Sequence, residues 1–193
     1  MEDKRLEIGL EYFRKKGWTP FPFQIEAWQD FLDGKSGLLN APTGSGKTFA
    51  LWFPALLEYI ENHPDTWQKP QANGIQLIWV TPLRALAQDL QKAMTEVCEV
   101  IGLPWQVAVR NGDTDSKTRS AMKRRPPECL ITTPETLHIL ISQKDHKELF
   151  QNLSAVVVDE WHELVGNKRG VQVQLALEYM QSINSNRFKR WAV

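Results

Sequence analysis

Apolar residues in this chain gather in short runs of strand length, separated by polar or amphipathic segments. Within each run the apolar residues follow one another almost without interruption instead of alternating with polar ones. Strands that are buried on both faces of a sheet have this pattern. The predicted strands are residues 37–40, 75–81, 106–110, 129–132 and 155–158, with a further apolar run at 190–193.

Helical periodicity marks the segments between most of these strands, because apolar residues recur there at spacings of three and four. The predicted helices are residues 5–16, 23–32, 49–61, 85–100, 116–123, 135–142 and 171–182, and the polar segment 63–73 is expected to be a surface loop. Alternation of strands and helices predicts an α/β fold with a mostly parallel sheet and helices on both faces. Ligands of such folds bind at the carboxyl ends of the strands.

A glycine-rich segment follows the first predicted strand and reads Ala-Pro-Thr-Gly-Ser-Gly-Lys-Thr at residues 41–48. Its glycines let successive N–H groups point at one anion, and the following helix adds the positive end of its dipole. Lys47 is expected to reach the β- and γ-phosphates of a nucleotide, and the Thr48 hydroxyl to hold Mg²⁺. The candidate nucleotide-binding residues here are Thr43, Gly44, Ser45, Gly46, Lys47 and Thr48.

Two adjacent carboxylates, Asp159 and Glu160, end the predicted strand at 155–158. Asp159 would hold Mg²⁺ opposite Thr48, and Glu160 would polarise the water that attacks the γ-phosphate. The alternatives are a glycine-rich loop that binds nothing, since Ala41 replaces the usual first glycine, and an ordinary acidic helix cap. The joint presence of both halves of one site favours nucleotide chemistry.

Composition limits the choice of partners and compartment. The 193 residues are 42% hydrophobic, which suits one sizeable core, and 23 basic residues balance 23 acidic ones. Any nucleic-acid binding must therefore use local geometry instead of bulk charge. Cys98 and Cys129 lie in apolar stretches and are expected to be buried free thiols. No apolar run is long enough to span a membrane, so we expect a cytoplasmic protein without a membrane partner.

Further segments resemble the motifs of superfamily 2 DExH-box helicases and translocases, in the same order along the chain. The glycine-rich loop and the Asp-Glu-Trp-His box at 159–162 carry the resemblance, which covers essentially all of the sequence. Residues 21–24 resemble the Q motif, 81–87 motif Ia, 132–137 motif Ib, and 111–114 a further strand-contacting turn. The resemblance implies a RecA-like nucleotide-binding domain with ATP and Mg²⁺ as cofactors.

Residue roles follow from these matches. The amide of Gln24 suits the adenine edge, and the ring of Phe21 is available for stacking on the base, although Phe21 and Trp18 are equally suited to anchoring the N-terminal helices. His162 is expected to couple the γ-phosphate site to the nucleic-acid track, and it joins Lys47, Asp159 and Glu160 as a catalytic candidate. The candidate contacts to the nucleic-acid backbone are Thr81, Pro82, Arg84, Gly112, Thr114, Thr133, Pro134 and Glu135.

The segments at 82–87, 159–164 and 168–170 are together similar to the large-helicase-related (Lhr-like) group, and Trp161 looks closest to its bacterial ligase-associated branch. This resemblance implies 3′-to-5′ movement on single-stranded DNA, a role in DNA repair, and possible partnership with a DNA ligase and a nuclease of one operon. It also suggests that Arg169 touches DNA or a partner domain.

The domain organisation expected from the resemblance has two parts. Residues 1–36 form N-terminal helices with the Q-like motif, packed on a core domain at 37–193 that is the first RecA-like domain of a helicase. The last apolar run leads into a Ser-Ala-Thr motif in the resembled family. We therefore expect a second RecA-like domain in the parent chain, which supplies arginine fingers, and an isolated first domain that is nearly inactive.

Two other functions remain as alternatives. An RNA helicase of superfamily 2 is compatible with the Q-like motif, whereas the Asp-Glu-Trp-His box and motif Ia favour the DNA enzymes. A nucleotide-gated DNA-binding module with a vestigial ATPase is opposed by the intact Lys47, Thr48, Asp159 and Glu160. The basic residues at 117–125 are either a solvated face or an unspecific phosphate attractor.

Overall fold

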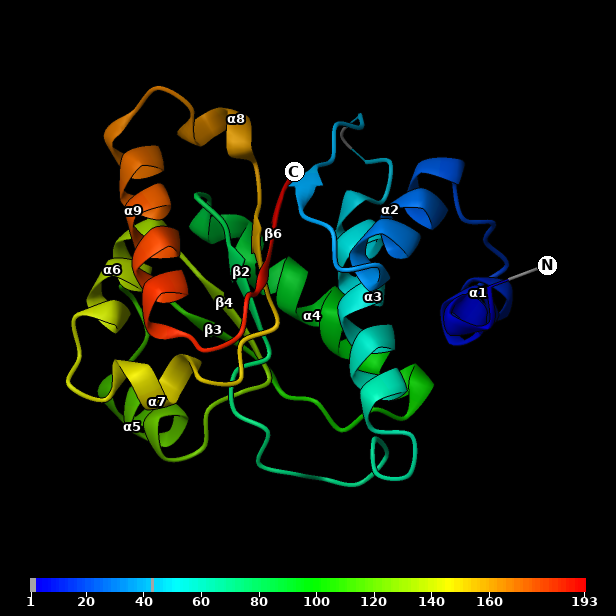
Figure 1. Cartoon of the computed structure of the whole chain (residues 1–193), viewed down its shortest axis with the longest axis horizontal. Coiled ribbons are helices and arrows are strands. Elements are labelled where there is room, and N and C mark those ends of the chain that lie inside the picture. Colours follow the sequence, from blue (N-terminus) through cyan, green and yellow to red (C-terminus); the bar gives the residue numbers. More distant parts are fainter. Residues whose placement is uncertain (1–2, 43) are drawn as a thin grey trace.

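A parallel sheet of six strands forms the centre of the computed structural model, which describes residues 3–42 and 44–193 (Figure 1). The strand order is β1-β6-β5-β2-β4-β3, and every neighbouring pair is parallel. The strands are β1 (Gly37–Leu38), β2 (Leu77–Val80), β3 (Val107–Arg110), β4 (Cys129–Thr132), β5 (Ala155–Val158) and β6 (Lys189–Ala192). The predicted RecA-like α/β fold is confirmed.

Helices cover both faces of the sheet, as Figure 1 shows. One face carries the first four helices and the core cluster that includes Leu77 and Trp79; the other carries a second cluster that includes Ile78 and Val80. The first group is α1 (Glu7–Lys15), α2 (Pro22–Leu32), α3 (Lys47–Asn62) and α4 (Arg84–Ile101). The second face carries α5 (Ser116–Arg124), α6 (Pro134–Ile141), α7 (His146–Phe150) and α9 (Lys168–Ile183).

Continuous burial explains the apolar runs. Every residue of β2, β4 and β5 is buried, because these strands lie inside the sheet with a core cluster on each face. The edge strand β1 is exposed and has only two residues, so the predicted strand at 37–40 is shorter than expected. The observed core strands also end within one or two residues of the predicted ranges.

The N-terminal helices share the main core. Leu6, Phe13 and Trp28 belong to the same buried cluster as Trp79, and the Trp28 indole N–H donates to the Phe49 carbonyl at 3.0 Å. A short 3₁₀ helix at Lys4–Leu6 precedes α1. The boundary between 1–36 and 37–193 stays a prediction.

Two short helices, α7 and α8 (Trp161–Leu164), were not predicted, because four or five residues carry too little periodicity. The helix α9 begins at Lys168, ahead of the predicted residue 171. Asn167 explains this start, since its side chain accepts hydrogen bonds from the N–H groups of Arg169 and Gly170.

Cys98 and Cys129 are buried free thiols, as predicted, and burial raises the pKa of both. No helix within the described residues is both long and apolar enough to cross a bilayer.

Candidate active site at the carboxyl edge of the sheet

All candidate site segments meet at one edge of the molecule, because the carboxyl ends of parallel strands lie together. The glycine-rich loop follows β1, and the carboxylates at 159–160 follow β5. The candidate nucleic-acid segments follow β2, β4 and β3, which are consecutive in the sheet. The strand order therefore separates a nucleotide half (β1, β6, β5) from a nucleic-acid half (β2, β4, β3).

The glycine-rich loop has the backbone that an anion site needs. Gly44 and Gly46 have φ angles of 78° and 80°, in the left-handed region where a side chain would be strained. Gly46 is the N-cap of α3, and no side chain of the described residues caps this helix, so its first N–H groups are available to an anion. The Ser45 hydroxyl donates to the Pro42 carbonyl at 2.6 Å and steadies the turn. Thr43 lies outside the described residues.

Gln24 fastens the loop to the N-terminal helices. Its side chain is 2% exposed; Nε2 donates to the Gly46 carbonyl at 2.9 Å, and Oε1 accepts from the Phe21 N–H at 2.8 Å. A Cβ on Gly46 would lie 2.7 Å from that Nε2, so the contact also requires glycine. The amide thus has backbone partners here, and its recognition of adenine stays a prediction.

The aromatic candidates Trp18 and Phe21 are about half exposed, at 47% and 54%. Trp18 packs at ring distances of 5.9–6.4 Å against Phe49, Phe13 and Tyr12, and Phe21 stacks on Phe23 at 5.8 Å. Both rings therefore combine packing contacts with free surface, and both interpretations stay open.

Asp159 is a half-buried carboxylate held by two donors. The Trp79 indole N–H donates to Oδ2 at 3.3 Å, and the Glu160 N–H donates to Oδ1 at 3.0 Å. Burial raises the pKa of Asp159, against the lowering effect of the Trp79 bond; the Glu160 charge raises it further and the Lys47 charge lowers it. A desolvated carboxylate beside a lysine is stabilised by a cation, so Asp159 fits a Mg²⁺ ligand.

Glu160 has a strained backbone. Its φ of 48° and ψ of 47° are left-handed, and it is the non-glycine residue with a positive φ among those described. Such strain gathers at functional positions, where the surrounding structure holds it. The neighbouring Trp161 N–H donates to the Val193 carbonyl at 2.7 Å, which fixes this turn to the end of the chain.

His162 lies beside two carboxylates at the surface. Its Nδ1 is 3.4 Å from Glu160 Oε2, its Nε2 is 3.4 Å from Glu163 Oε1, and its side chain is 68% exposed. The first contact places the imidazole next to the residue predicted to polarise water. Its exposure leaves it free to contact a second domain.

The candidate nucleic-acid residues divide into buried and exposed groups. Thr81 and Thr133 are buried, and both hydroxyls accept from backbone N–H groups, of Leu83 and Thr136 respectively. Their hydroxyls are therefore used to fix the N-termini of α4 and α6 and are less available to a ligand. Pro82 and Pro134 are also buried, Thr114 is half-buried, and Arg84, Gly112 and Glu135 are exposed. The Thr114 hydroxyl accepts from the Asn111 N–H at 3.0 Å.

Arginines connect the three strand-end segments. Arg84 lies over Gly112 and pairs with Asp113 at 3.2 Å, joining the ends of β2 and β3. Arg169 pairs with Glu135 at 2.7 Å and donates to the Pro82 carbonyl at 3.0 Å, joining the ends of β4 and β2. The exposed Arg84 and the half-buried Arg169 therefore tie together the segments that follow β2, β3 and β4.

Sequence reasoning missed two of these roles. Trp79 and Asp159 are 80 positions apart in the sequence, so no local motif predicts the hydrogen bond between them. The available signal was that a buried indole N–H usually has an acceptor. The bridge made by Arg169 likewise depends on helix placement. The helix α9 approaches α8 so closely that a Cβ on Gly170 would lie 2.1 Å from the Leu164 carbonyl oxygen.

The remaining basic candidates lie on α5 and at Arg125, the residue that follows it. The side chains of Lys117, Arg119, Lys123, Arg124 and Arg125 are exposed, and Lys123 pairs with Asp145 at 2.9 Å. Within residues 3–42 and 44–193, no group of three or more His, Cys, Asp or Glu side chains is arranged to hold a metal ion. A Mg²⁺ ion at Asp159 would therefore need further oxygen ligands, such as the Thr48 hydroxyl, a phosphate or water.

A model of the DEAD/DEAH box helicase family matches residues 21–190. The chain is 37% identical over 186 residues to the Lhr helicase/probable uracil glycosylase of Mycolicibacterium smegmatis, covering 91% of this chain and 12% of that protein. It is 36% identical over 183 residues to the ATP-dependent helicase Lhr-Core of Methanocaldococcus jannaschii, covering 90% of this chain and 21% of that protein.

A solved structure agrees with these relatives. The Mycobacterium smegmatis helicase Lhr bound to single-stranded DNA and AMP-PNP superimposes with a TM-score of 0.79 at 35% identity, covering 98% of this chain and 25% of that one. The chain thus spans a quarter or less of the length of each of these proteins.

Proposed function

The chain belongs to the DEAD/DEAH box helicase family, and from this premise we propose that it is the ATP-binding domain of an ATP-dependent DNA helicase or translocase of the Lhr-like kind. One observation carries the proposal: the glycine-rich loop, the half-buried Asp159, and the arginines Arg84 and Arg169 share one edge of one sheet. A motor needs these parts side by side, because nucleotide hydrolysis must change how tightly the protein binds the nucleic acid.

The nucleotide half assigns a task to each residue. The N–H groups at the start of α3 and the Lys47 ammonium hold the phosphates, with the loop braced by Gln24. Thr48 and Asp159 would hold Mg²⁺, which supplies neutralisation of phosphate charge during phosphoryl transfer. Glu160 accepts the proton of the attacking water, and His162 beside it relays the state of this carboxylate to neighbouring surfaces.

The nucleic-acid half offers backbone contacts without base readout. The N-termini of α4 and α6 and the guanidinium of Arg84 suit phosphates, which gives sequence-independent binding of one strand. The exposed pair with Asp113 is weak, so Arg84 exchanges that carboxylate for a phosphate at little cost. The similar Lhr structure is bound to single-stranded DNA, which supports DNA as the substrate.

The remaining parts of the proposal concern the whole protein. A second RecA-like domain would face this edge and supply arginine fingers, which are worth about 10³–10⁵ in turnover. We propose 3′-to-5′ movement, a cytoplasmic role in DNA repair, and partnership with a DNA ligase and a nuclease, as in the ligase-associated branch that Trp161 resembles.

Glu160→Gln tests the nucleotide half in the 193-residue chain. We expect slow single-turnover ATP hydrolysis by the unmodified chain, and about a 100-fold or greater loss in Glu160→Gln with nucleotide affinity within about twofold, since a general base contributes about 10²–10⁴. Glu163→Gln, the exposed neighbour on α8, is the matched control and should hydrolyse normally. Hydrolysis that persists in Glu160→Gln refutes the assigned role.

Competition binding distinguishes the DNA motor from an RNA helicase. A labelled single strand bound to the chain should be displaced more effectively by unlabelled DNA than by RNA of matched length and sequence. Preference for the RNA competitor would favour the RNA helicase, and identical DNA affinity with and without ATP in the parent protein would favour a binding module.

A further inference from the structure

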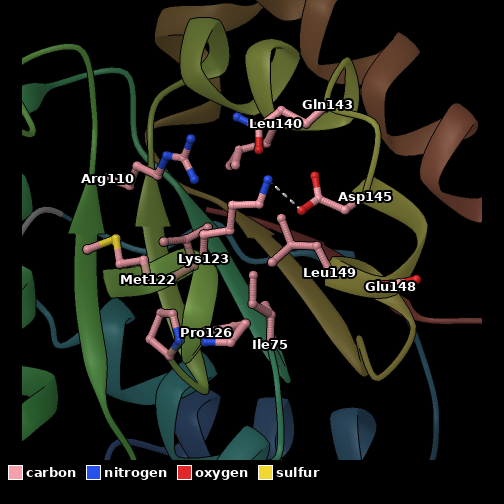
Figure 2. A pocket seen from close by; sticks show the side chains of 12 residues that line it. Ile75, Arg110, Met122, Lys123, Pro126, Leu140, Gln143, Asp145, Glu148 and Leu149 are labelled. Atoms are coloured by element: carbon pink, nitrogen blue, oxygen red, sulfur yellow. Dashed lines mark ion pairs between the residues drawn. The ribbon is translucent and has the colours of Figure 1, made fainter. Parts of the chain in front are cut away.

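A second cavity lies away from the candidate active site, under α5 and α7 on the opposite face of the sheet from α3. Its volume is about 150 Å³, with room for roughly ten water-sized groups. Apolar side chains form most of its wall, including Ile75, Met122, Leu130, Leu140 and Leu149. Figure 2 shows the charged residues Arg110, Lys123 and Asp145 around this apolar wall.

Arg110 is the unusual member of this cavity. It ends β3 and is 9% exposed, and Figure 2 shows its guanidinium reaching into the cavity toward Leu140. Among residues 3–42 and 44–193, no group accepts a hydrogen bond or forms an ion pair with this guanidinium. Burial lowers the pKa of Arg110, the charge of Arg119 on α5 lowers it further, and the charge of Asp145 partly opposes both effects. The enclosed side-chain polar atoms that lack a partner in the described residues do not include the Arg110 nitrogens, so these keep some contact with solvent. An anion that enters the cavity would give this largely buried cation a charged partner.

The other described charged residues around the cavity do not form a hydrogen bond or an ion pair with the Arg110 guanidinium. Lys123 and Asp145 neutralise each other across 2.9 Å at the mouth, where their side chains are 64% and 37% exposed. Glu148 is exposed, and Figure 2 shows its carboxylate directed outward. The local positive potential is reinforced by the exposed Arg119, so an incoming anion is attracted toward Arg110.

We propose that this cavity binds a carboxylate carried on a short aliphatic body, with Arg110 as its anion partner. A guanidinium matches a carboxylate through two parallel N–H···O bonds, and the apolar wall suits an aliphatic chain. A phosphate fits less well, because its oxygens need more donors than this wall provides. The carboxylate has two possible sources: a free aliphatic acid, or a glutamate flanked by apolar residues in a peptide.

Hexanoate is the probe, titrated into the 193-residue chain while the Arg Nε–Hε signals are followed by NMR. We expect saturable binding with a Kd on the order of millimolar, because the ligand is small. The neutral analogue 1-hexanol should bind at least about tenfold more weakly, since one lost charge-assisted contact is worth about that factor. Arg110→Met should lose the preference for hexanoate, whereas the control Arg119→Met should keep it.

Arg110→Met also tests folding independently of ligand, because it replaces an unpaired buried charge with an apolar side chain of similar length. The variant should be at least as heat-stable as the unmodified chain. Equal binding of hexanol and hexanoate, unchanged hexanoate binding in Arg110→Met, or no saturable binding at all would overturn the proposal. Binding that appears only after Asp145→Asn would overturn it too, since Asp145 would then be the partner of Arg110.

The source of the carboxylate is decided by a second titration. The peptide acetyl-Leu-Glu-Leu-amide is compared with its glutamine counterpart and with hexanoate. Tighter, Arg110-dependent binding of the glutamate peptide supports a protein segment as the occupant; tighter binding of hexanoate supports a free acid. Neither titration depends on ATP or DNA, so the proposal stands or fails independently of the helicase function.

Discussion

Adjacent carboxylates in this chain receive different environments from their backbone. Asp159 points back into the protein, where Trp79 and a backbone N–H hold it, while the left-handed turn at Glu160 places the next side chain beside His162. The first arrangement suits a metal ligand, and the second suits a residue that handles water. The surrounding structure at the sheet edge holds the strained backbone of Glu160, and this strain keeps the two carboxylates in different environments.

The strain predicts an unusual stability effect. Left-handed backbone costs a non-glycine residue about 1–2 kcal/mol, and glycine loses about 0.5–1 kcal/mol through chain entropy. Glu160→Gly should therefore be as stable as Glu160→Gln, or up to about 1.5 kcal/mol more stable, although both lose hydrolysis. Urea unfolding of both variants measures the difference. A Glu160→Gly chain clearly less stable than Glu160→Gln would show that the turn is not strained.

At the scale of elements, α9 holds the nucleic-acid half together. Asn167 sets its start, Gly170 allows its close approach to α8, and Arg169 reaches Glu135 and the Pro82 carbonyl. The exposed carboxylate of Glu135 would repel a phosphate backbone if it stood alone. Its pairing with Arg169 removes that repulsion and fixes the segments after β2 and β4 relative to each other.

This pairing predicts a pH effect. Burial raises the pKa of Glu135, but the Arg169 hydrogen bond and further donors outweigh it, so the pKa lies below 4.5. The pair therefore stabilises the fold fully above pH 4.5, and this contribution is lost as the pH falls through the lower pKa of the folded chain. In Arg169→Met the pKa should rise and this acid-sensitive contribution should disappear.

A carbon-13 NMR titration of the Glu135 carboxyl measures this shift. Lys168→Met, which removes the neighbouring cation on the same helix, is the control and should leave the Glu135 pKa nearly unchanged. An unaltered Glu135 pKa in Arg169→Met would contradict the bridge.

At the scale of the whole molecule, the strand order divides one edge into the two halves that we propose bind nucleotide and nucleic acid. The nucleotide half follows β1 and β5, and the nucleic-acid half follows β2, β4 and β3. The junction is the β5–β2 pair, where Asp159 donates its N–H to the Val80 carbonyl and accepts from Trp79. Coupling between ATP and DNA would pass through these short contacts, whereas each half keeps its own binding residues.

Binding to the two halves should therefore be separable. Arg84→Ala should weaken binding of single-stranded DNA and reduce the magnitude of its salt slope by about 0.7, the effect of one lost phosphate contact. Its nucleotide affinity should be unchanged. Lys47→Ala should show the reverse pattern in titrations with fluorescent DNA and fluorescent nucleotide. Equal loss of both affinities in Arg84→Ala would contradict the division.

Most of the fold was predictable from local pattern. Buried parallel strands are continuously apolar, so β2, β4 and β5 could be recognised from the sequence. The glycine-rich loop predicted a nucleotide site, because phosphate binding requires its residue types. The short helices α7 and α8 and the early start of α9 escaped, because they depend on a few capping contacts instead of periodicity.

The sequence by itself determined the fold class and predicted a nucleotide loop with an acidic partner, because strand burial and phosphate chemistry restrict residue types at short spacing. Only the tertiary structure decided that Trp79 holds Asp159, that Arg169 joins two strand ends, and that the buried Arg110 side chain has no hydrogen-bond or ion-pair partner among the described residues. These relations depend on the order of strands in the sheet and on helix packing, which bring together residues that are distant along the chain.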